Sequence, residues 1–551
     1  MRIIVIGAVA AGTSAAAKAR RNDDFSEIVI YERDKDISYS GCGLPYYIGG
    51  EIKDIDELAP RNSSFFKKKY NIDVFTGYEV LNIDSTEKNI AVKNLDTNEV
   101  FKDTYDKLVL ATGAVPFIPN IKGIENKNIF FLRNIQSARN IKNFIINNKP
   151  KNAVIVGTGF IGFEMLENLL EDGLNVTIIE KANKITSNLD EDMAQFLENA
   201  LIKKNILIKK NASIGEINNN KVILDNGIEI KCDMVIMATG VKPNTYLAKE
   251  CGVETGITGA IKVDNRMETN IKDIYACGDC IETFSSITGK SIYRPLGSTA
   301  NKTGRIAGDV LTGGSLIYKG NLGTGIFKLF DMTIASTGLS EKEALAEGYE
   351  IQICHNIKSD KPSYFHGKEM VIKAVADKKT EKLLGVQIIG YEGVDKRIDV
   401  FATLITYGAK VDELFHLDLA YAPPFSTTKD PVHYTGMILD NAINNSKPII
   451  TSSELENLTQ KGEKVQIIDV RVPKQYDEAH VYMAENIPHS SLRDDLVKLD
   501  RKVITVTYCN KGVTGNAVQN ILINHGFKKV YNLSGGHKFY TGSKIKKVNN
   551  K

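Results

Sequence analysis

Short apolar runs rich in β-branched residues alternate with glycine turns and helix-like segments from the start of the chain. The first run, Ile3 to Ile6, is followed by the turn Gly7 to Gly12, an alanine-rich segment and the run Ile28 to Glu32. This order predicts a βαβ unit, in which small residues let the backbone approach a pyrophosphate at the helix N-terminus. Glu32 is then positioned for a ribose hydroxyl. Because Val9 occupies the place of a middle glycine, this turn alone is a weak signal.

The same pattern returns between Ala153 and Glu180. This copy has all three glycines, Gly157, Gly159 and Gly162, and we predict its helix from Phe163. It is the stronger match to a dinucleotide-binding turn. Two such units in one chain predict two bound dinucleotides.

Glu180 bears on the choice of nicotinamide cofactor. A carboxylate at the end of the second strand pairs with a ribose diol and repels a 2′-phosphate, so it predicts NADH. Lys181 and Lys184 lie close enough in sequence to soften that repulsion. NADPH therefore stays open as an alternative.

Each unit is followed by a strand that ends in an Ala-Thr-Gly turn, at residues 111–113 and 238–240, and a later strand leads to Gly278 and Asp279 before an expected helical stretch. Together these motifs resemble the two-dinucleotide flavoprotein reductases. The resemblance implies FAD in the first unit, NAD(P)H in the second, and contact between Asp279 and the flavin ribityl chain. The cofactor-binding residues predicted in this way are Gly7, Gly12, Glu32, Ala111, Thr112, Gly113, Gly278, Asp279, Gly157, Gly159, Phe160, Gly162, Glu180 and Gly240.

Cys42 is a single thiol in a glycine-flanked segment, Ser38 to Pro45. An internal redox dithiol would place a second cysteine five positions on, but that position is Tyr47. The second sulfur of any redox disulfide must therefore come from the substrate. Thiol–disulfide exchange at Cys42 also requires a low thiol pKa and an open approach.

The segment from Ser38 to Gly50, the turn Gly7 to Gly12 and the segment Tyr421 to Ser426 resemble the coenzyme A disulfide reductases over roughly residues 1–440. The resemblance implies that NADH reduces the flavin, which reduces a mixed disulfide between Cys42 and CoA. Related NADH oxidases and peroxidases carry a histidine where this chain has Ala10, which counts against a specialist for oxygen or peroxide. An NADH oxidase, or a sulfur-carrier or sensor module that delivers persulfide to a partner protein, remains an alternative.

The same resemblance implies further site residues. Phe160 resembles an aromatic gate over the flavin, and Tyr421 a tyrosine that enters from the partner subunit of a homodimer and protonates the leaving CoA thiolate. Tyr364 is a less secure second catalytic tyrosine. The candidates for binding CoA are Ser38, Asn301, Arg305 and Arg61, with Lys67 to Lys69 beside them, although for the basic residues a solvated surface is the plainer interpretation.

A second lone cysteine, Cys509, lies in a C-terminal segment where strands and helices alternate again. This segment resembles a rhodanese domain. The loop after Cys509 runs from a strand into a helix, where N–H groups can hold a persulfide anion, so we predict a catalytic, sulfur-carrying role for Cys509. Family members often carry an arginine five residues after the cysteine, but this chain has Thr514, which weakens the case for thiosulfate as donor.

Composition limits the alternatives. Lys plus Arg number 70 and Asp plus Glu 67 in 551 residues, a net charge of +3 that predicts no nucleic-acid partner. No apolar run approaches a membrane span, no leader precedes the first strand, and the seven cysteines lack framework spacing, so we expect a cytoplasmic protein with reduced thiols. Cys277 and Cys280 are expected to be structural, and no metal site is predicted.

We therefore predict an α/β protein of four domains. The predicted ranges are 1–118 and 250–322 for an FAD-binding domain, 119–249 for an NAD(P)H-binding domain, 323–442 for an α+β dimerisation domain and 449–548 for an α/β rhodanese domain. The predicted function is reduction of CoA disulfide, CoA persulfide or polysulfide.

Overall fold

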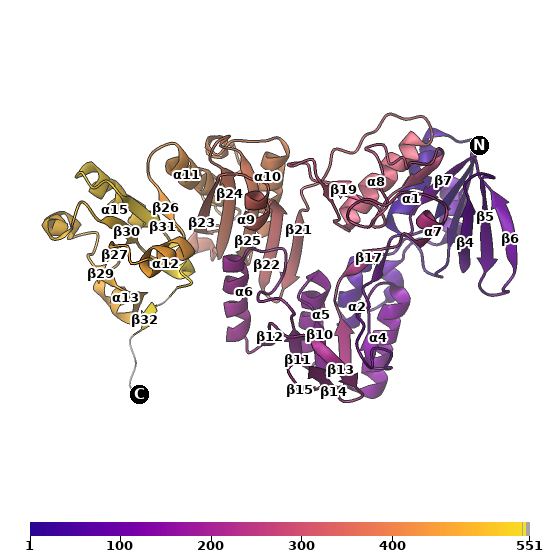
Figure 1. Ribbon diagram of the computed structural model, residues 1–551, viewed down its shortest axis with the longest axis horizontal. Coiled ribbons are helices and arrows are strands. Elements are labelled where there is room, and N and C mark those ends of the chain that lie inside the picture. The colour runs from indigo at the N-terminus through magenta and orange to yellow at the C-terminus, as the bar shows by residue number, and fades with distance from the viewer. Residues whose placement is uncertain (543, 547–551) are drawn as a thin grey trace. The chain divides into compact units, whose positions relative to one another are not determined.

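A computed structural model describes residues 1–542 and 544–546 of the chain. It separates into two compact units (Figure 1). The first comprises Met1–Asn183 and Ile206–Gly323, and the second comprises Lys184–Asn205 and the described residues from Thr324 onward. The predicted end of the last domain at residue 548 lies outside the described residues.

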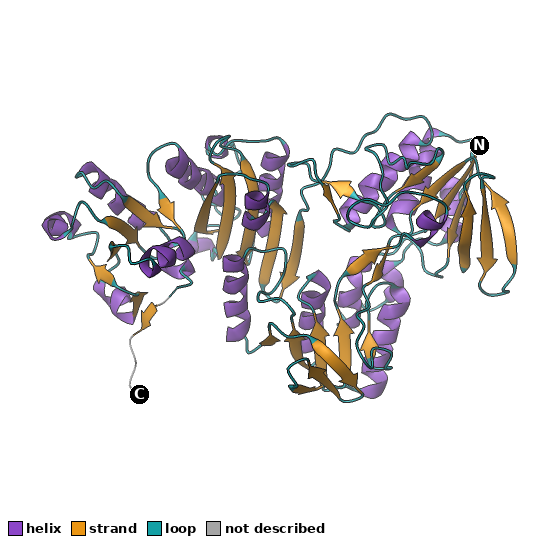
Figure 2. Ribbon diagram, viewed as in Figure 1, coloured by secondary structure: helices purple, strands orange, loops and turns teal. Residues whose placement is uncertain are grey.

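The first unit is built around two parallel sheets of five strands each, with helices beside them (Figure 2). One sheet has the order β18-β7-β1-β2-β3, with bounds β1 Arg2–Ile6, β2 Glu27–Glu32, β3 Asp73–Thr76, β7 Lys107–Leu110 and β18 Ile274–Ala276. Its central strands are fully buried runs of Ile and Val, as expected for a parallel sheet covered on both faces. Strand β18 follows all strands of the second sheet in the chain, so the first sheet is assembled from two separate stretches of sequence.

Two helices pack closely beside this first sheet. They are α1 (Ala10–Asn22) and α8 (Gly297–Val310). A Cβ atom on Gly304 would lie 2.3 Å from the Ala11 carbonyl oxygen, so the glycine permits direct backbone contact between the helices. This packing places the exposed positions of α8 next to the start of α1.

The second sheet of this unit has the order β12-β11-β10-β16-β9, with bounds β9 Ile129–Phe130, β10 Asn152–Val156, β11 Asn175–Ile179, β12 Leu207–Lys209 and β16 Met234–Met237. Its helices are α4 (Ile135–Asn148) and α5 (Phe160–Glu171). The remaining elements of the unit are α2 Leu44–Ile48, α3 Ser63–Tyr70, α7 Tyr246–Glu250, β4 Tyr78–Asp84, β5 Asn89–Asn94, β6 Val100–Thr104, β8 Ala114–Pro116, β13 Ile214–Asn218, β14 Lys221–Leu224, β15 Glu229–Lys231, β17 Val241–Pro243, β19 Thr283–Phe284 and β20 Ser291–Ile292.

Two local predictions were wrong. Helix α5 begins at Phe160 rather than Phe163, because Gly159 already serves as its N-cap and the last glycine lies inside the first turn. No helix directly follows Asp279. The chain instead forms β19 and β20 before α8 begins at Gly297.

The second unit contains an antiparallel sheet with the order β21-β22-β25-β24-β23. The strands are β21 Gly325–Leu329, β22 Met332–Gly338, β23 Ile351–Ser359, β24 Glu369–Asp377 and β25 Leu383–Gly390, and the helices are α6 Glu191–Lys203, α9 Glu341–Ala346, α10 Val394–Thr406 and α11 Pro431–Ile443. Helix α10 packs on β22 and β25, and α11 packs on β23. The edge strand β23 has one free edge in this sheet.

The C-terminal part of the same unit is a parallel sheet with the order β26-β31-β30-β27-β29. Its elements are β26 Ile449–Ile450, β27 Val465–Asp469, β29 Ala484–Asn486, β30 Ile504–Tyr508, β31 Val530–Leu533, α12 Ser452–Gln460, α13 Pro473–Glu478, α14 Leu492–Asp495, α15 Val513–Asn524 and α16 Gly536–Phe539, with β28 Ala479–Val481 paired to β32 Lys544–Lys546. The predicted α/β class is confirmed. Every helix in residues 1–542 and 544–546 is too short or too polar to span a membrane.

Candidate active site

The two glycine turns of the first unit fold in the same way. Gly7 has φ +108° and Gly157 has φ +101°, a backbone conformation that side chains disfavour. A Cβ atom would lie 2.3 Å from the Ala111 carbonyl oxygen in the first turn and 2.5 Å from the Ala238 carbonyl oxygen in the second. Each Ala-Thr-Gly segment is therefore packed against the first glycine of one turn.

The other positions of the two turns explain why one copy tolerates valine. Cβ atoms on Gly12 and Gly162 would lie 1.9 and 2.2 Å from the carbonyl oxygens of the first glycines, so both must stay glycine. At the middle position φ is negative in both turns, −97° at Val9 and −76° at Gly159, so φ does not require a glycine there; Gly159 is extended, whereas a ψ of −117° puts Val9 outside the common helical and extended regions. Val9 is therefore compatible with the turn.

The acidic residue after each second strand is held beside its turn by matching hydrogen bonds. Glu32 accepts the N–H of Ala8 at 2.8 Å and that of Asp34 at 3.0 Å. Glu180 accepts the N–H of Thr158 at 3.1 Å and that of Ala182 at 2.8 Å. Burial raises the pKa of Glu32, although its two N–H donors oppose the shift. The backbone approach and the placed carboxylate fit a dinucleotide in each turn.

The remaining predicted cofactor residues lie at turns of the same unit. Thr112 donates its hydroxyl to the Asn244 carbonyl at 2.6 Å, and Gly113, Gly240 and Gly278 all have positive φ. Phe160, half-buried, is the first residue of α5.

Asp279 is held in place by Arg133, a residue that the sequence patterns did not single out. The guanidinium forms an ion pair with the Asp279 carboxylate at 3.0 Å and donates to the Ala114 carbonyl at 2.9 Å. Tyr293 donates to the Asp279 carbonyl at 2.9 Å. Arg133 precedes α4 and has no motif around it, so only the fold brings it to Asp279.

Cys42 lies in a 3₁₀ turn, Gly41–Gly43, immediately before α2, and it is exposed. Partial desolvation raises the pKa of its thiol, and the carboxylates of Glu164 and Asp279 raise it further, whereas Arg133 lowers it. The low thiol pKa that exchange chemistry requires is therefore not produced by these side chains. The sequence could not reveal this, because neither carboxylate is near Cys42 in the chain.

Glu164, one of the acids that raise the pKa of Cys42, has a strongly raised pKa itself. Burial raises its pKa to about 7, and Glu167 contributes in the same direction. Glu164 lies four residues after Phe160 on α5, which packs against the Cys42-bearing segment through α2. A separation of four residues puts Glu164 on the same face of α5 as Phe160. In the sequence, this spacing was the only feature that pointed to Glu164.

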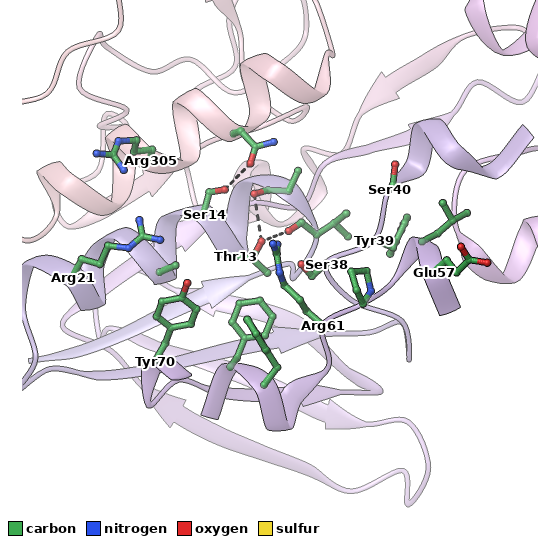
Figure 3. Close-up of a pocket in the computed structure, with 18 residues that line it drawn as sticks. Thr13, Ser14, Arg21, Ser38, Tyr39, Ser40, Glu57, Arg61, Tyr70 and Arg305 are labelled. Carbon is green, nitrogen blue, oxygen red and sulfur yellow. Dashed lines mark hydrogen bonds between the residues drawn. The ribbon is translucent and has the colours of Figure 1, made fainter. Parts of the chain in front are cut away.

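A cleft of about 600 Å³ opens beside the first glycine turn. It is lined by all four predicted CoA-binding residues: Ser38, Arg61, Asn301 and Arg305. Figure 3 shows Arg61 and Arg305 with a third arginine, Arg21, around this cleft. Ser14 donates to the Asn301 side chain at 2.8 Å across α1 and α8. Tyr39 and Ser40, which shortly precede Cys42 in the chain, also line the cleft, whereas Cys42 itself does not.

The cations of this cleft are not neutralised by carboxylates. Among the described residues, none of Arg21, Arg61 and Arg305 takes part in an ion pair. Arg61 lies over the Phe65 ring at 5.8 Å and Arg21 over the Tyr70 ring at 5.8 Å. Lys67 to Lys69 do not line the cleft. Three unpaired guanidinium groups make the cleft suited to an anion that carries phosphates.

The two predicted catalytic tyrosines belong to the second unit. Tyr421 is 47% exposed, and Tyr364 is 67% exposed in a 3₁₀ turn after β23. The Tyr364 ring lies beside that of its neighbour Phe365, with ring centroids 5.4 Å apart. Both are therefore available at the surface of that unit.

Cys509 follows β30 and is buried, with 9% of its surface exposed. Helix α15 begins four residues later, capped by Gly512 at φ +93°. In the described part of the chain, the backbone N–H groups of residues 510–515 find no hydrogen-bond acceptor. Unpaired N–H groups at a helix N-terminus favour an anion on the cysteine sulfur.

Cys277 and Cys280 differ from these two thiols. Both are free and fully buried. Burial raises the pKa of each thiol, that of Cys280 to about 11. These properties match a structural role.

Family models divide the chain into three matched parts. The model "Pyridine nucleotide-disulphide oxidoreductase" matches residues 1–295, and its dimerisation domain matches residues 325–431. A "Rhodanese-like domain" matches residues 451–541.

Known proteins match either the first four fifths of the chain or nearly all of it. The coenzyme A disulfide reductase of Staphylococcus haemolyticus is 36% identical over 79% of this chain and 98% of its own length. The crystal structure of reduced CoADR-RHD from Bacillus anthracis is 36% identical, with a TM-score of 0.95 over 98% of this chain and 97% of that one. A NAD-dependent persulfide reductase from A. fulgidus is 36% identical, with a TM-score of 0.91 over 98% of this chain and 100% of its own. The predicted resemblance is confirmed.

We predict that Glu164→Gln speeds alkylation of Cys42 by iodoacetamide several-fold at mildly alkaline pH. The substitution removes a carboxylate that raises the pKa of Cys42, so more of the thiol is ionised. The difference should fade below about pH 7, where the parent Glu164 is itself protonated. Alkylation rates across pH, followed by mass spectrometry of the Cys42 peptide, provide the measurement.

Glu171→Gln is the matched control, because Glu171 ends the same helix and is exposed. Cys42 in this control variant should be alkylated at the same rate as in the parent. Equal rates in Glu164→Gln and the parent at every pH would show that Glu164 does not act on the thiol.

Proposed function

We propose, from the premise that this chain belongs to the pyridine nucleotide-disulphide oxidoreductase family, that it reduces CoA disulfide, CoA persulfide or polysulfide with NAD(P)H. The observation that carries the proposal is the cleft with three unpaired arginines, whose lining includes Ser38, Tyr39 and Ser40, the residues just before the turn with Cys42. CoA presents phosphates at one end and a thiol at the other. A cationic cleft lined by the segment that precedes a lone thiol matches both ends.

The cofactors follow from the family, whose members use FAD and NAD(P)H. When bound, they supply a hydride and pass two electrons on to sulfur. The first turn, with Gly7, Gly12 and Glu32, would hold the FAD dinucleotide, and the second, with Glu180, the nicotinamide dinucleotide. Both carboxylate oxygens of Glu180 already accept N–H groups, so the residue is fixed to receive a ribose diol and favours NADH.

Cys42 carries the exchange step. Its thiolate attacks one sulfur of CoA disulfide, the S–S bond breaks, and one CoA thiolate leaves while a Cys42–CoA mixed disulfide forms. Two-electron reduction of that mixed disulfide releases the second CoA and restores the Cys42 thiolate. We assign to Glu164 the role of proton acceptor for Cys42, because burial raises its pKa to about 7 and its carboxylate interacts electrostatically with the thiol.

We place the active enzyme as a homodimer in which Tyr421, and less securely Tyr364, reach the partner's Cys42 and protonate the leaving CoA thiolate. The matched dimerisation domain and the exposure of large side chains there support this assignment. Phe365, Phe415 and Phe425 are exposed at 41%, 46% and 71%. A cytoplasmic location completes the proposal, since all seven cysteines are free.

The rhodanese domain adds a sulfur-carrying step. Cys509, buried beneath unpaired N–H groups, would hold sulfane sulfur as a persulfide and pass it to CoA. CoA persulfide formed in this way is then a substrate for Cys42. The alternatives, an NADH oxidase or a persulfide carrier that serves a partner protein, are distinguished by the assays below.

We expect the parent enzyme to consume NADH without oxygen when CoA disulfide, CoA persulfide or polysulfide with CoA is supplied. Cys42→Ser should abolish this turnover while FAD stays bound, because the thiolate is the sole protein sulfur in the exchange. The absorbance of NADH measures turnover, and the absorbance of the flavin measures FAD binding. NADH consumption with air alone at the rate seen with disulfide would favour the oxidase, and retained disulfide turnover in Cys42→Ser would remove Cys42 from the mechanism.

Arg61→Met should raise the KM for CoA disulfide about tenfold while kcat stays within about twofold, as expected for loss of one binding contact of about 1.4 kcal/mol. Steady-state kinetics provide the test. Lys67→Met removes the same charge outside the cleft, where Lys67 pairs with Asp73, and should behave as the parent. A similar KM for both variants and the parent would exclude Arg61 from CoA binding.

Tyr421→Phe should bind CoA substrate as the parent does but turn over slowly. When it is mixed with Cys42→Ser, each mixed dimer holds one site with both residues intact, so activity should recover in part. The turnover rate of the mixture, measured after subunit exchange has been verified, shows whether Tyr421 acts across the dimer. No recovery would mean that the tyrosine acts within its own chain or not at all.

A further inference from the structure

Helix α16 holds the backbone of the loop that carries Cys509. The N–H groups of His537 and Lys538 donate to the carbonyl oxygens of Cys509 and Asn510 at 2.8 and 3.0 Å. A Cβ atom on Gly536 would lie 2.4 Å from the Cys509 carbonyl oxygen, so the two backbones are in direct contact. The conformation of the Cys509 loop therefore depends on where α16 is docked.

Within the second unit, α16 is docked on the edge strand β23 of the antiparallel sheet. The N–H and the Nδ1 of His355 on β23 lie 2.7 and 2.9 Å from the Oγ of Ser534, which shortly precedes α16. The His355 ring stacks on Phe539, the last residue of α16, with ring centroids 4.2 Å apart. The dimerisation domain thus contacts the segment that holds the Cys509 loop.

Glu369, the first residue of β24, adds a charged contact to this docking. Its carboxylate forms ion pairs with Lys511 in the Cys509 loop and with Lys538 on α16, the latter at 2.7 Å. Burial raises the pKa of Glu369, but the bonds from the two lysines outweigh burial and lower the pKa. The carboxylate therefore stays ionised at neutral pH. A residue of the dimerisation domain is thus bonded directly to a side chain of the Cys509 loop.

The ion pairs of Glu369 occupy the positive charge that the loop itself carries. Lys511 is the one cation among residues 509–515. Arg471, which donates to the Asn510 side chain at 3.3 Å, is itself paired with a carboxylate. What the loop still offers an anion is the set of backbone N–H groups that have no acceptor in the described part of the chain.

Donors of sulfane sulfur differ in where they carry their charge. Thiosulfate carries two negative charges on oxygens bonded to the atom next to the attacked sulfur, and it releases the sulfite dianion. A polysulfide carries its two charges at opposite ends of a sulfur chain. Sulfite that leaves a partly desolvated loop needs a cation more than a polysulfide does, because its charge is concentrated. The availability of Lys511 therefore affects which donor reacts.

We propose that Glu369 is a specificity-determining residue of the Cys509 site. By binding Lys511 it withholds the cation of the loop from thiosulfate, and it leaves the site selective for polysulfide or persulfide donors. This inference rests on the proposed sulfane-sulfur function of Cys509. Glu369 acts through Lys511 and is therefore a positioning residue. The selectivity of the rhodanese domain is set in part by the dimerisation domain.

The two donors undergo the same attack. The Cys509 thiolate attacks a sulfane sulfur, one S–S bond breaks, and the Cys509 persulfide forms. The leaving group takes the electron pair of that bond and is sulfite from thiosulfate or the trisulfide dianion from tetrasulfide. No outside oxidant or reductant takes part. A difference between the two rates therefore reports how the site treats the charge of the donor and of its leaving group.

The test is the rate at which Cys509 becomes persulfidated by sodium thiosulfate and by sodium tetrasulfide, without oxygen and in a single turnover. The full chain carries Cys42→Ser, so that the exposed thiol does not compete for the donor. Alkylation and mass spectrometry of the Cys509 peptide give the rate. Glu369→Gln should raise the rate with thiosulfate about fivefold or more, because Lys511 is released. The rate with tetrasulfide should stay within about twofold of the parent.

Two further variants separate charge from structure. Glu369→Gln combined with Lys511→Met should return to the parent rate with thiosulfate, because the released cation is removed. Glu381→Gln removes the carboxylate of another ion pair of the same domain, with Lys410 at 3.6 Å, in the turn after β24. This control should load at the parent rate with both donors. The gain in Glu369→Gln should also shrink with added salt.

An unchanged or lower thiosulfate rate in Glu369→Gln overturns the inference. So does an equal gain with tetrasulfide, which would indicate a more open loop, and so does a gain that persists without Lys511. The proposed function is tested separately by the parent. Absence of Cys509 persulfide after tetrasulfide treatment of the parent removes the sulfur-carrying role, whereas normal loading by tetrasulfide with no thiosulfate gain in Glu369→Gln removes only the role of Glu369.

Discussion

Lys373 is fully buried, and the carboxylates of Asp190, Asp192 and Glu341 surround its ammonium group at 3.2, 2.9 and 2.7 Å. Burial alone would lower the pKa of this lysine, but the three carboxylates outweigh it and raise the pKa. Asp192 also binds His355, which bonds the rhodanese domain through Ser534. The need to pair one buried charge thus holds α6, α9, β23, β24 and the rhodanese domain together.

Buried and exposed arginines are treated differently in this fold. Arg397 pairs with Asp430 at 2.8 Å and Arg471 with Asp469 at 2.6 Å, while buried Arg20 donates to backbone carbonyls. Arg61 and Arg305 are exposed, line one cleft and have no carboxylate partner among the described residues. Their guanidinium groups are therefore available to an anionic ligand.

Local chemistry explains what could be predicted from sequence. The glycine turns and the placement of Glu32 and Glu180 depend on contacts within one βαβ unit, so spacing alone identified them, and the α/β class followed from the alternation of elements. Glu164 was missed because Cys42, the thiol whose pKa it raises, comes from a distant element, the turn before α2. Residue spacing along the chain does not identify a charged side chain that tertiary packing brings to a site.

The two thiols occupy different settings. Desolvation and the carboxylates of Glu164 and Asp279 raise the pKa of the Cys42 thiol, so its ionisation must be coupled to events in the active site. Cys509 instead lies just before α15, where the backbone N–H groups of residues 510–515 have no acceptor in the described part of the chain. Such donors can hold an anionic sulfur species. A thiol that ionises with its substrate suits reduction, and a sulfur held by N–H donors suits carriage.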